Sequence, residues 1–250
     1  MKIKTAIVSY HNTLPFLHAI HRSSLKDKLD LILAAPSQCA SLFSTNQVDI
    51  ALVPVGALSE MEEYEFLSDT CIGCNGEVYT VAIFSNQPLE SCDQIYLDSD
   101  SRTSNELARI ILEDFMGLDL ELKGKMVLPL EIQTNSAYVL IGDKVFEYEK
   151  SFKYKYDLGQ LWKEYTGLPF AFAVWIVRKN VNKEMIKETE SILNHLDITA
   201  IENKVIAADI TLHQYLTEYI SYNFDEAKRE ALAKFLSLQK SIGKRVKSMV

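Results

Sequence analysis

The chain has 250 residues, of which 26 are Lys or Arg and 34 are Asp or Glu, so its formal net charge is −8. Hydrophobic residues make up 48% of the chain, which is enough for a buried core and excludes disordered and collagen-like classes. The acidic balance excludes a general nucleic-acid binder, which carries a basic surplus. It permits a small anionic ligand in a locally positive pocket.

The start of the chain and its cysteines indicate a compartment. The apolar stretch 5–8 is shorter than a signal peptide requires, and no apolar run approaches the ~20 residues of a membrane span. Four cysteines are few for a secreted disulfide framework. We therefore expect a soluble cytoplasmic protein with free thiols and with no membrane or nucleic-acid partner.

Short apolar segments alternate with helical patterns along the chain. Strands are predicted at residues 2–9, 29–35, 49–53, 94–97, 125–131 and 137–141, with long β-prone segments at 78–84 and 170–177. Helices are predicted from Thr13 and at residues 36–46, 104–116, 157–165, 183–196, 210–220 and 225–237. This alternation is typical of parallel sheets that helices cover on both faces.

The two long β-prone segments flank an inserted α/β unit, which predicts an α/β fold of two lobes joined by a pair of crossing strands. We expect residues 1–84 and 177–250 to form the first lobe and residues 85–176 the second. Ligands of open α/β sheets bind at the carboxyl ends of strands, near helix N-termini. The cleft between the lobes is therefore the expected site.

The first polar cluster at a predicted strand end is Ser9-Tyr10-His11-Asn12-Thr13. Its hydroxyls, its amide and the free N–H groups of the following helix are donors for a ligand. Asn and Thr are also ordinary helix N-caps, and one turn can serve both purposes. We take Ser9, Tyr10 and Asn12 as candidate site residues.

The second cluster, Ser101-Arg102-Thr103-Ser104, follows the strand that ends near Asp98. Three hydroxyls and one guanidinium at a helix start suit a carboxylate, and a cap alone needs only one of them. The alternative is a capping box formed by Thr103 and Glu106, with Arg102 on the surface.

Two further positions are candidates. Thr80 brings a hydroxyl into a β-prone run, although β-propensity alone explains a threonine there. Asp143 follows Ile141-Gly142 at a strand end and is a candidate proton acceptor.

Other motifs favour structural roles. Cys71-Ile-Gly-Cys74 has the spacing of a metal or redox pair, but the sequence offers no second ligand pair, and Asn75-Gly76 leads into a strand rather than a helix. His18 and His21 lack acidic or cysteine partners at a useful spacing. Dinucleotide, phosphate-loop, zinc-protease and serine-hydrolase motifs are absent as well. We expect no metal and no cofactor.

Taken together, the motifs resemble the menaquinone biosynthesis family of the futalosine route, in its chorismate dehydratase branch (MqnA). The matching stretches are residues 8–15 (VSYHNTLP), 48–54 (VDIALVP), 71–76 (CIGCNG), 97–104 (LDSDSRTS), 140–143 (LIGD), 156–159 (YDLG) and 166–175 (TGLPFAFAVW). Two departures are His11, where an apolar residue such as Leu is expected, and Thr80, where Ser is common.

The resemblance implies a periplasmic-binding-protein type II fold and dehydration of chorismate to 3-[(1-carboxyvinyl)oxy]benzoate. For that substrate, our hypothesis is that Ser101, Arg102, Thr103 and Ser104 hold one carboxylate. Ser9, Asn12 and Thr80 would bind the other end, with Asn12 orienting the leaving hydroxyl or the enolpyruvyl group, and Tyr10 is a further substrate-binding candidate. The substrate's own side-chain carboxylate would accept the proton, with Asp143 as the alternative. A sister family (MqnD) and a non-catalytic binder of an aromatic carboxylate are the alternative functions.

Overall fold

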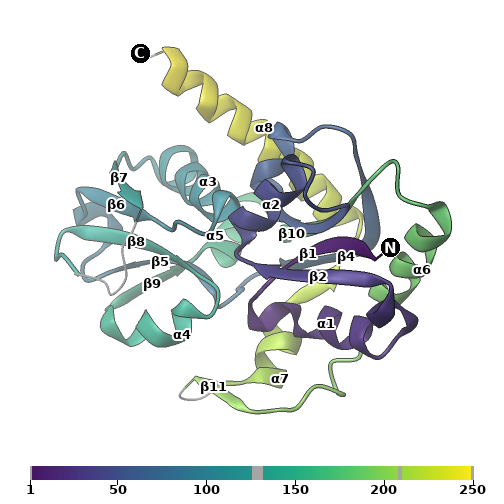
Figure 1. Cartoon of the computed structure of the whole chain (residues 1–250). Helices are drawn as coiled ribbons and strands as arrows, with labels where there is room; N and C mark the ends of the chain where they lie inside the picture. The colour runs from purple at the N-terminus through teal and green to yellow at the C-terminus, as the bar shows by residue number, and fades with distance from the viewer. Residues whose placement is uncertain (1, 126–131, 208–209, 249–250) are drawn as a thin grey trace.

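Two mixed β-sheets lie side by side in the computed structural model, which describes residues 2–125, 132–207 and 210–248 (Figure 1). We call each sheet with its helices a lobe. The six-stranded sheet of the first lobe has the order β13 (Ser221–Asn223), β4 (Tyr64–Cys74), β10 (Phe170–Arg178), β3 (Ile50–Pro54), β1 (Ile3–Val8), β2 (Leu29–Ala34). The five-stranded sheet of the second lobe has the order β7 (Glu121–Lys125), β6 (Gln94–Leu97), β8 (Ser136–Ile141), β5 (Val81–Ser85), β9 (Tyr154–Asp157).

Helices cover these sheets. They are α1 (Leu14–His21), α2 (Pro36–Ser44), α3 (Arg102–Ile110), α4 (Lys144–Tyr148), α5 (Leu158–Thr166), α6 (Lys183–Leu193), α7 (Leu212–Gln214) and α8 (Glu226–Ser248). In Figure 1, α2 and α1 lie on opposite sides of the first sheet. The last helix, α8, packs on both β10 and α3 and so contacts both lobes. Strands β11 (Val205–Ala207) and β12 (Ile210–Thr211) form a separate two-stranded ribbon.

The chain crosses between the lobes twice. It leaves the first sheet after β4, enters the second at β5, and returns from α5 to β10. The pairing assigns residues 81–85 to the second sheet and residues 170–178 to the first. The lobe boundaries expected at 84/85 and 176/177 stay a prediction. They differ from the strand pairing, in which residues 81–84 belong to the second sheet and residues 170–176 to the first.

The predicted fold class, a two-lobed α/β protein, is confirmed, but the sheets are not wholly parallel. Strands β1, β2 and β3 pair in parallel, whereas β10 runs antiparallel to both β3 and β4. In the second sheet β6 is parallel to β8, and β5 is antiparallel to it. The strands that follow each crossing, β10 and β5, are antiparallel to their neighbours, and so is the edge strand β13, which pairs with β4.

Three stretches of the chain differ from the prediction. Residues 64–74, for which no element is predicted, form β4, whose pairing with β10 contains bulges. The strand predicted at 78–84 begins only at Val81, because residues 78–80 form a turn. The helix predicted at 210–220 is divided into β12, α7 and a π-helical turn, Tyr215–Tyr219. Most of the strand predicted at 125–131 lies outside the described residues, and β7 precedes it.

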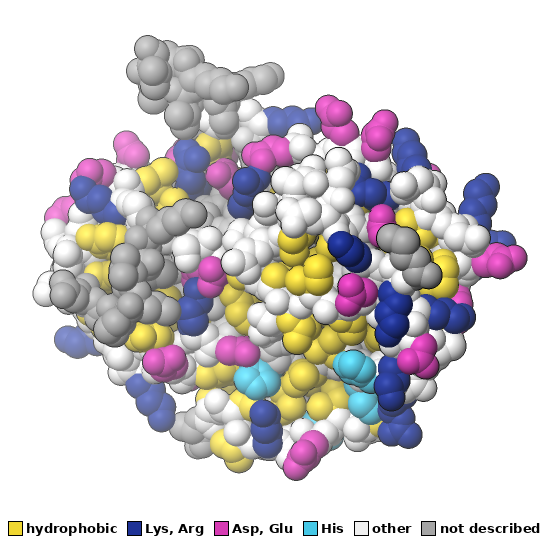
Figure 2. All heavy atoms as spheres, viewed as in Figure 1, with side chains coloured by type: hydrophobic (Ala, Val, Ile, Leu, Met, Phe, Trp, Pro, Cys, Tyr) yellow, Lys and Arg dark blue, Asp and Glu magenta, His cyan; other side chains and the backbone are white. Residues whose placement is uncertain are grey.

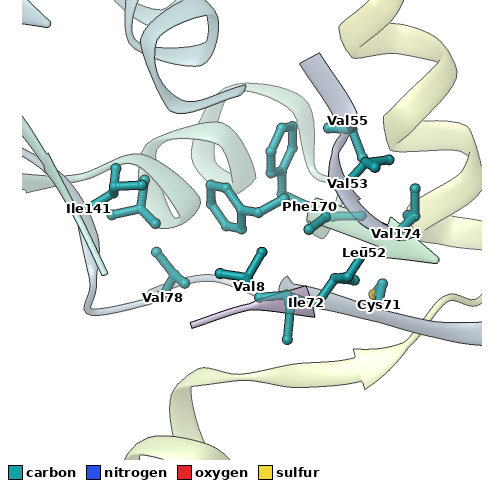
Figure 3. Packing of buried hydrophobic residues seen from close by; sticks show 14 of the residues in the cluster. Val8, Leu52, Val53, Val55, Cys71, Ile72, Val78, Ile141, Phe170 and Val174 are labelled. Carbon is teal, nitrogen blue, oxygen red and sulfur yellow. The ribbon is translucent and has the colours of Figure 1, made fainter. Parts of the chain in front are cut away.

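A continuous apolar core extends from one lobe to the other. Figure 3 shows Val8, Leu52 and Val174 of the first sheet in the same cluster as Val78 and Ile141 near the second. On the face seen in Figure 2, acidic and basic side chains are interspersed around a central apolar area. No helix among the described residues has the length and apolar character to cross a membrane.

Candidate functional site

A small cavity lies between the lobes, and we call it the interlobe cavity. Its volume is about 50 Å³, which holds a few water molecules and is far below the ~300 Å³ typical of ligand pockets. Its lining residues are Val8, Tyr10, Asn12, Pro36, Pro54, Ile72, Val78, Thr80, Val81, Ser101, Thr103, Ser104, Ile141, Gly142, Phe172 and Ala173. Figure 3 shows part of the apolar wall, including Ile72 and Ile141. Among these described residues none carries a formal charge.

Asn12 brings the first polar group to the cavity. It lies in a 3₁₀ turn, His11–Thr13, directly after β1, and is only 9% exposed. The side-chain oxygen Oδ1 is buried and has no hydrogen-bond partner among the described residues. The backbone is held from the far end of the chain, because Tyr222 Oη donates to the Asn12 carbonyl at 2.8 Å. A buried acceptor without a partner is costly in a folded protein and is expected where a ligand satisfies it.

Thr80 brings the second polar group, and its side chain is fully buried. Its Oγ1 lies 2.7 Å from Tyr215 Oη. Gly142 N donates to the Thr80 carbonyl at 2.8 Å, which ties this crossing segment to the end of β8. Burial raises the pKa of Tyr215, and side-chain hydrogen bonds to Thr80 and Asn12 oppose that rise. The three polar side chains therefore form one buried network.

A strained turn positions Thr80. Tyr79 has a φ of 68°, in the left-handed region that costs a non-glycine residue about 1–2 kcal/mol. The Asp157 carboxylate holds this turn by accepting the N–H groups of Val78 at 3.2 Å and Tyr79 at 2.8 Å. It also caps α5 by accepting Gln160 N–H. Burial raises the pKa of Asp157 from 3.8 to about 6, against the effect of these three donors.

The start of α3 brings two serines to the cavity. Ser101 is the N-cap: its Oγ accepts the Ser104 N–H at 2.9 Å and donates to Ser104 Oγ at 2.9 Å. The Ser104 hydroxyl proton is left to donate to a bound group. The alternative capping box of Thr103 and Glu106 does not form, because Ser101 occupies the cap position.

Thr103 joins the lobes. Its Oγ1 accepts the Gly56 N–H at 2.9 Å and donates to the Phe172 carbonyl at 3.2 Å. A Cβ on Gly56 would lie 2.9 Å from the Thr103 Cα, so only glycine permits this approach. The Thr103 hydroxyl is thus used within the protein, although the residue lines the cavity.

Two predicted substrate-binding residues lie outside the cavity lining. Arg102 is 51% exposed and forms an ion pair with Glu60. Ser9 is exposed, and its N–H donates to the Ala34 carbonyl at 3.0 Å as a continuation of the β1–β2 pairing. The structure therefore brings Tyr10, Asn12, Thr80, Ser101, Thr103 and Ser104 together, and it does not bring Ser9 or Arg102 to them.

Asp143 lies beside the cavity and contacts the opposite lobe. Its Oδ2 is 2.8 Å from His11 Nδ1, and its Oδ1 accepts the His11 backbone N–H at 3.2 Å. Next to it, the ring of Tyr10 packs against Gly142, where an added Cβ would lie 2.7 Å from the ring. Burial, followed by the charges of Asp100, Asp98 and Asp143, raises the pKa of Tyr10 well above its ordinary value. Tyr10 is therefore a neutral hydroxyl at this position.

Sequence reasoning missed three residues near the site, namely Tyr215, Tyr222 and Lys144. Lys144 Nζ lies 2.8 Å from Asp98 Oδ1 and 2.9 Å from Asp100 Oδ2, and so fastens the segment before α3. Burial lowers the pKa of Lys144, but the interactions with the Asp98 and Asp100 carboxylates have the larger combined effect and raise this pKa above its ordinary value. In the sequence, Asp98 and Asp100 just before the serine cluster indicate that a cationic side chain lies nearby. No comparable pattern in the sequence indicates Tyr215 or Tyr222.

The cysteine motif is part of the core. Cys71 and Cys74 are free and buried, and burial raises the pKa of Cys71 to about 12. A Cβ on Gly73 would lie 2.5 Å from the Phe170 carbonyl, and one on Gly159 would lie 2.6 Å from Cys74 Sγ. Close packing of β4, β10 and α5 at the crossing therefore accounts for these residues. Among the described residues no group of three or more His, Cys, Asp or Glu side chains is arranged to hold a metal ion.

The two lobes and the cavity between them define the class of protein, a periplasmic-binding-protein-like α/β fold. The chain is similar in structure to a protein from Archaeoglobus fulgidus, with a TM-score of 0.70, 15% identity, and coverage of 97% of this chain and 98% of that one. It is also similar to a Candida albicans protein described as exhibiting the generic periplasmic binding protein structural fold, with a TM-score of 0.63, 10% identity, and coverage of 96% and 90%.

A family model described as menaquinone biosynthesis matches residues 3–241, so the chain belongs to that family. It is 25% identical over 187 residues to a chorismate dehydratase of Thermus thermophilus, covering 68% of each chain. It is 24% identical over 245 residues to a chorismate dehydratase of Campylobacter jejuni, covering 94% of this chain and 96% of that one. The family resemblance read from the motifs is confirmed.

Proposed function

We propose that this protein is a chorismate dehydratase that forms 3-[(1-carboxyvinyl)oxy]benzoate in menaquinone biosynthesis by the futalosine route. Family membership and the names of the two relatives support the substrate. The observation that carries the proposal is the buried Asn12 Oδ1, which no described residue satisfies and which shares one cavity with a hydroxyl network and the start of α3. A cytoplasmic location stays a prediction from the sequence.

The chemistry of the reaction suits neutral polar groups. Dehydration removes one ring proton and the neighbouring hydroxyl of chorismate, and the ring becomes aromatic. Because aromatisation favours the product, the site must mainly orient the substrate, stabilise developing charge and exclude water. In this proposal Asn12 and Thr80 bind the leaving hydroxyl from the buried side of the cavity.

The start of α3 is the proposed carboxylate site. The first turn of a helix presents free N–H groups and a partial positive charge, and the Ser104 hydroxyl adds a further donor. Arg102 would have to leave Glu60 to contribute, so we assign the main role to the neutral donors. In this arrangement a charge inside the cavity is not required for the anion to bind.

The substrate's own side-chain carboxylate is the proposed proton acceptor. The resemblance to the family suggests this role, and the contacts of Asp143 favour it over the alternative. The Asp143 carboxylate already accepts from His11, and Asp143 does not line the cavity. The proton passes from the ring carbon to the carboxylate, the C–H electrons form the new ring double bond, and the hydroxyl leaves with the C–O bond electrons. The carboxylic acid then returns its proton to the departing hydroxide, so that one water is released and the carboxylate is restored.

Binding requires the lobes to separate. The cavity volume of about 50 Å³ is too small for a substrate of chorismate's size, so the described arrangement corresponds to a closed one. The contacts between His11 and Asp143, and between Tyr10 and Gly142, lie beside the cavity and would break on opening. Closure then excludes water from the reacting centre.

Incubation of the purified protein with chorismate tests the proposal, with the product identified by its ultraviolet spectrum and mass. The expected result is enzyme-dependent loss of one water and appearance of the aromatic ether. Binding of chorismate without turnover would favour the non-catalytic binder and overturn the proposal. Absence of both binding and turnover would also overturn it and favour the sister reaction, to be tested with later intermediates of the route.

A further inference from the structure

We propose that Tyr215 is a positioning residue that sets the direction of the hydrogen bonds which Asn12 and Thr80 offer to the substrate. This inference rests on the proposed function. Tyr215 comes from the π-helical turn Tyr215–Tyr219, more than a hundred residues after Thr80 in the chain. It is fully buried and does not itself line the cavity.

The contacts of Tyr215 fix its position. Its Oη lies 2.7 Å from Thr80 Oγ1 and is also hydrogen-bonded to the Asn12 side chain. Its ring packs edge-on against Phe146 of α4, with centroids 5.5 Å apart and an interplanar angle of 89°. Because Phe146 belongs to the second lobe, the Tyr215 ring is held between the lobes.

The donor and acceptor roles follow from what each group can do. Asn12 Oδ1 has no partner in the part of the chain that the structure describes, so the bond from Asn12 to Tyr215 uses the amide N–H, and Tyr215 Oη accepts. Tyr215 has one proton, which it then donates to Thr80 Oγ1. The Thr80 hydroxyl proton is consequently directed away from Tyr215, toward the cavity.

This order gives the substrate one acceptor and one donor. Asn12 Oδ1 accepts from the leaving hydroxyl, while the Thr80 hydroxyl donates to its oxygen. Without the Tyr215 hydroxyl, the Asn12 amide is free to flip and the Thr80 proton is free to point elsewhere. Tyr215 transfers no proton in this proposal, and its effect is to hold two neighbours in the productive orientation.

The test compares Tyr215→Phe with Tyr219→Phe, a matched variant in the same turn. Tyr215→Phe keeps the buried ring and removes only the hydroxyl. We expect its kcat for chorismate to fall about 10-fold to 100-fold, with KM changed less than about 3-fold. Tyr219→Phe is expected to keep the wild-type kcat. A wild-type kcat in Tyr215→Phe would overturn the proposal.

A double variant separates positioning from a merely structural role. Because Tyr215 acts through Thr80, Tyr215→Phe is expected to lower kcat little further in a Thr80→Val background, whereas two independent effects would multiply. If the double variant loses kcat by the product of the two single losses, the proposal is overturned. Thr80→Ser, which keeps the hydroxyl, is expected to retain the sensitivity to Tyr215→Phe.

A readout without turnover distinguishes failure of this inference from failure of the proposed function. In NMR spectra of the substrate-free protein, the Asn12 side-chain amide protons are expected to exchange slowly with water. Tyr215→Phe is expected to accelerate that exchange at least about 10-fold, and Tyr219→Phe is not. Unchanged exchange in Tyr215→Phe would overturn the positioning role, whatever the wild-type protein does with chorismate.

Discussion

Asp143 Oδ2 lies 2.8 Å from His11 Nδ1, and the same carboxylate accepts the His11 backbone N–H at 3.2 Å. His11 follows β1 of the first lobe and Asp143 follows β8 of the second. The pair therefore fastens the lobes beside the interlobe cavity. Both side chains are partly exposed, at 24% and 35%, so solvent screening limits the strength of the contact.

Asp143→Ala tests whether this pair assists closure or supplies a catalytic base. A partly exposed pair is worth at most ~1 kcal/mol, so we expect kcat/KM for chorismate to fall no more than about 5-fold. His11→Leu should give a similar loss, and the double variant should lose little more than either single one. A fall of about 100-fold or more in Asp143→Ala alone would instead indicate that Asp143 is the base.

Gly142→Ala tests the contact between the lobes at Tyr10. Gly142 has a φ of 64°, and its added Cβ would lie 2.7 Å from the Tyr10 ring. Gly117→Ala is the matched control, because Gly117 has a φ of 68° with nothing within 4 Å of the added Cβ. We expect KM for chorismate to rise about 10-fold in Gly142→Ala and to stay unchanged in Gly117→Ala. Equal effects in both variants would show that backbone strain, and not the contact, is responsible.

Asp157 gives a pH dependence of stability. Burial raises its pKa in the folded state from 3.8 to about 6, so the folded state binds the proton more tightly than the unfolded state. The contribution of Asp157 to the free energy of unfolding therefore increases as pH falls through 6 and is complete below about pH 4. Two pKa units correspond to about 3 kcal/mol.

Urea unfolding of the wild type and of Asp157→Asn at several pH values measures this contribution. Between pH 8 and pH 4, the wild type should gain up to about 3 kcal/mol relative to Asp157→Asn. The opposite slope would mean that the three backbone donors outweigh burial and that the carboxylate prefers its charged form.

Arg102→Ala tests where the substrate carboxylate binds. Since Arg102 is paired with Glu60 at the surface, we expect KM for chorismate to change less than about 3-fold, as in the matched variant Glu60→Ala. A guanidinium that contacts the carboxylate would contribute more, and its loss would raise KM about 10-fold or more. That larger effect would show that Arg102 turns inward when the substrate binds.

The sequence patterns predicted the fold class because apolar strands and helices alternate at short range. Residues at strand ends, such as Asn12 and Ser104, meet at one cavity for the same reason. The strand β4 was not predicted, because Gly73 and the bulges in its pairing reflect contact with β10 rather than a local preference.

Other features depend on contacts between distant segments, which local patterns do not encode. The hydroxyl of Thr103 looked like a ligand donor, but the close approach of Gly56 uses it within the protein. Tyr215 lies in a stretch predicted as a helix, and only the fold places its hydroxyl on Thr80.

The most direct test of the proposed function is the rate at which Asn12→Ala dehydrates chorismate, measured by ultraviolet absorbance of the aromatic product. Asn180→Ala, an exposed asparagine outside the cavity lining, is the matched control, and thermal unfolding confirms that each variant folds. We expect turnover to fall about 100-fold or more in Asn12→Ala and to stay at the wild-type level in Asn180→Ala. Wild-type turnover in a folded Asn12→Ala variant would contradict the central claim that the interlobe cavity is the catalytic site.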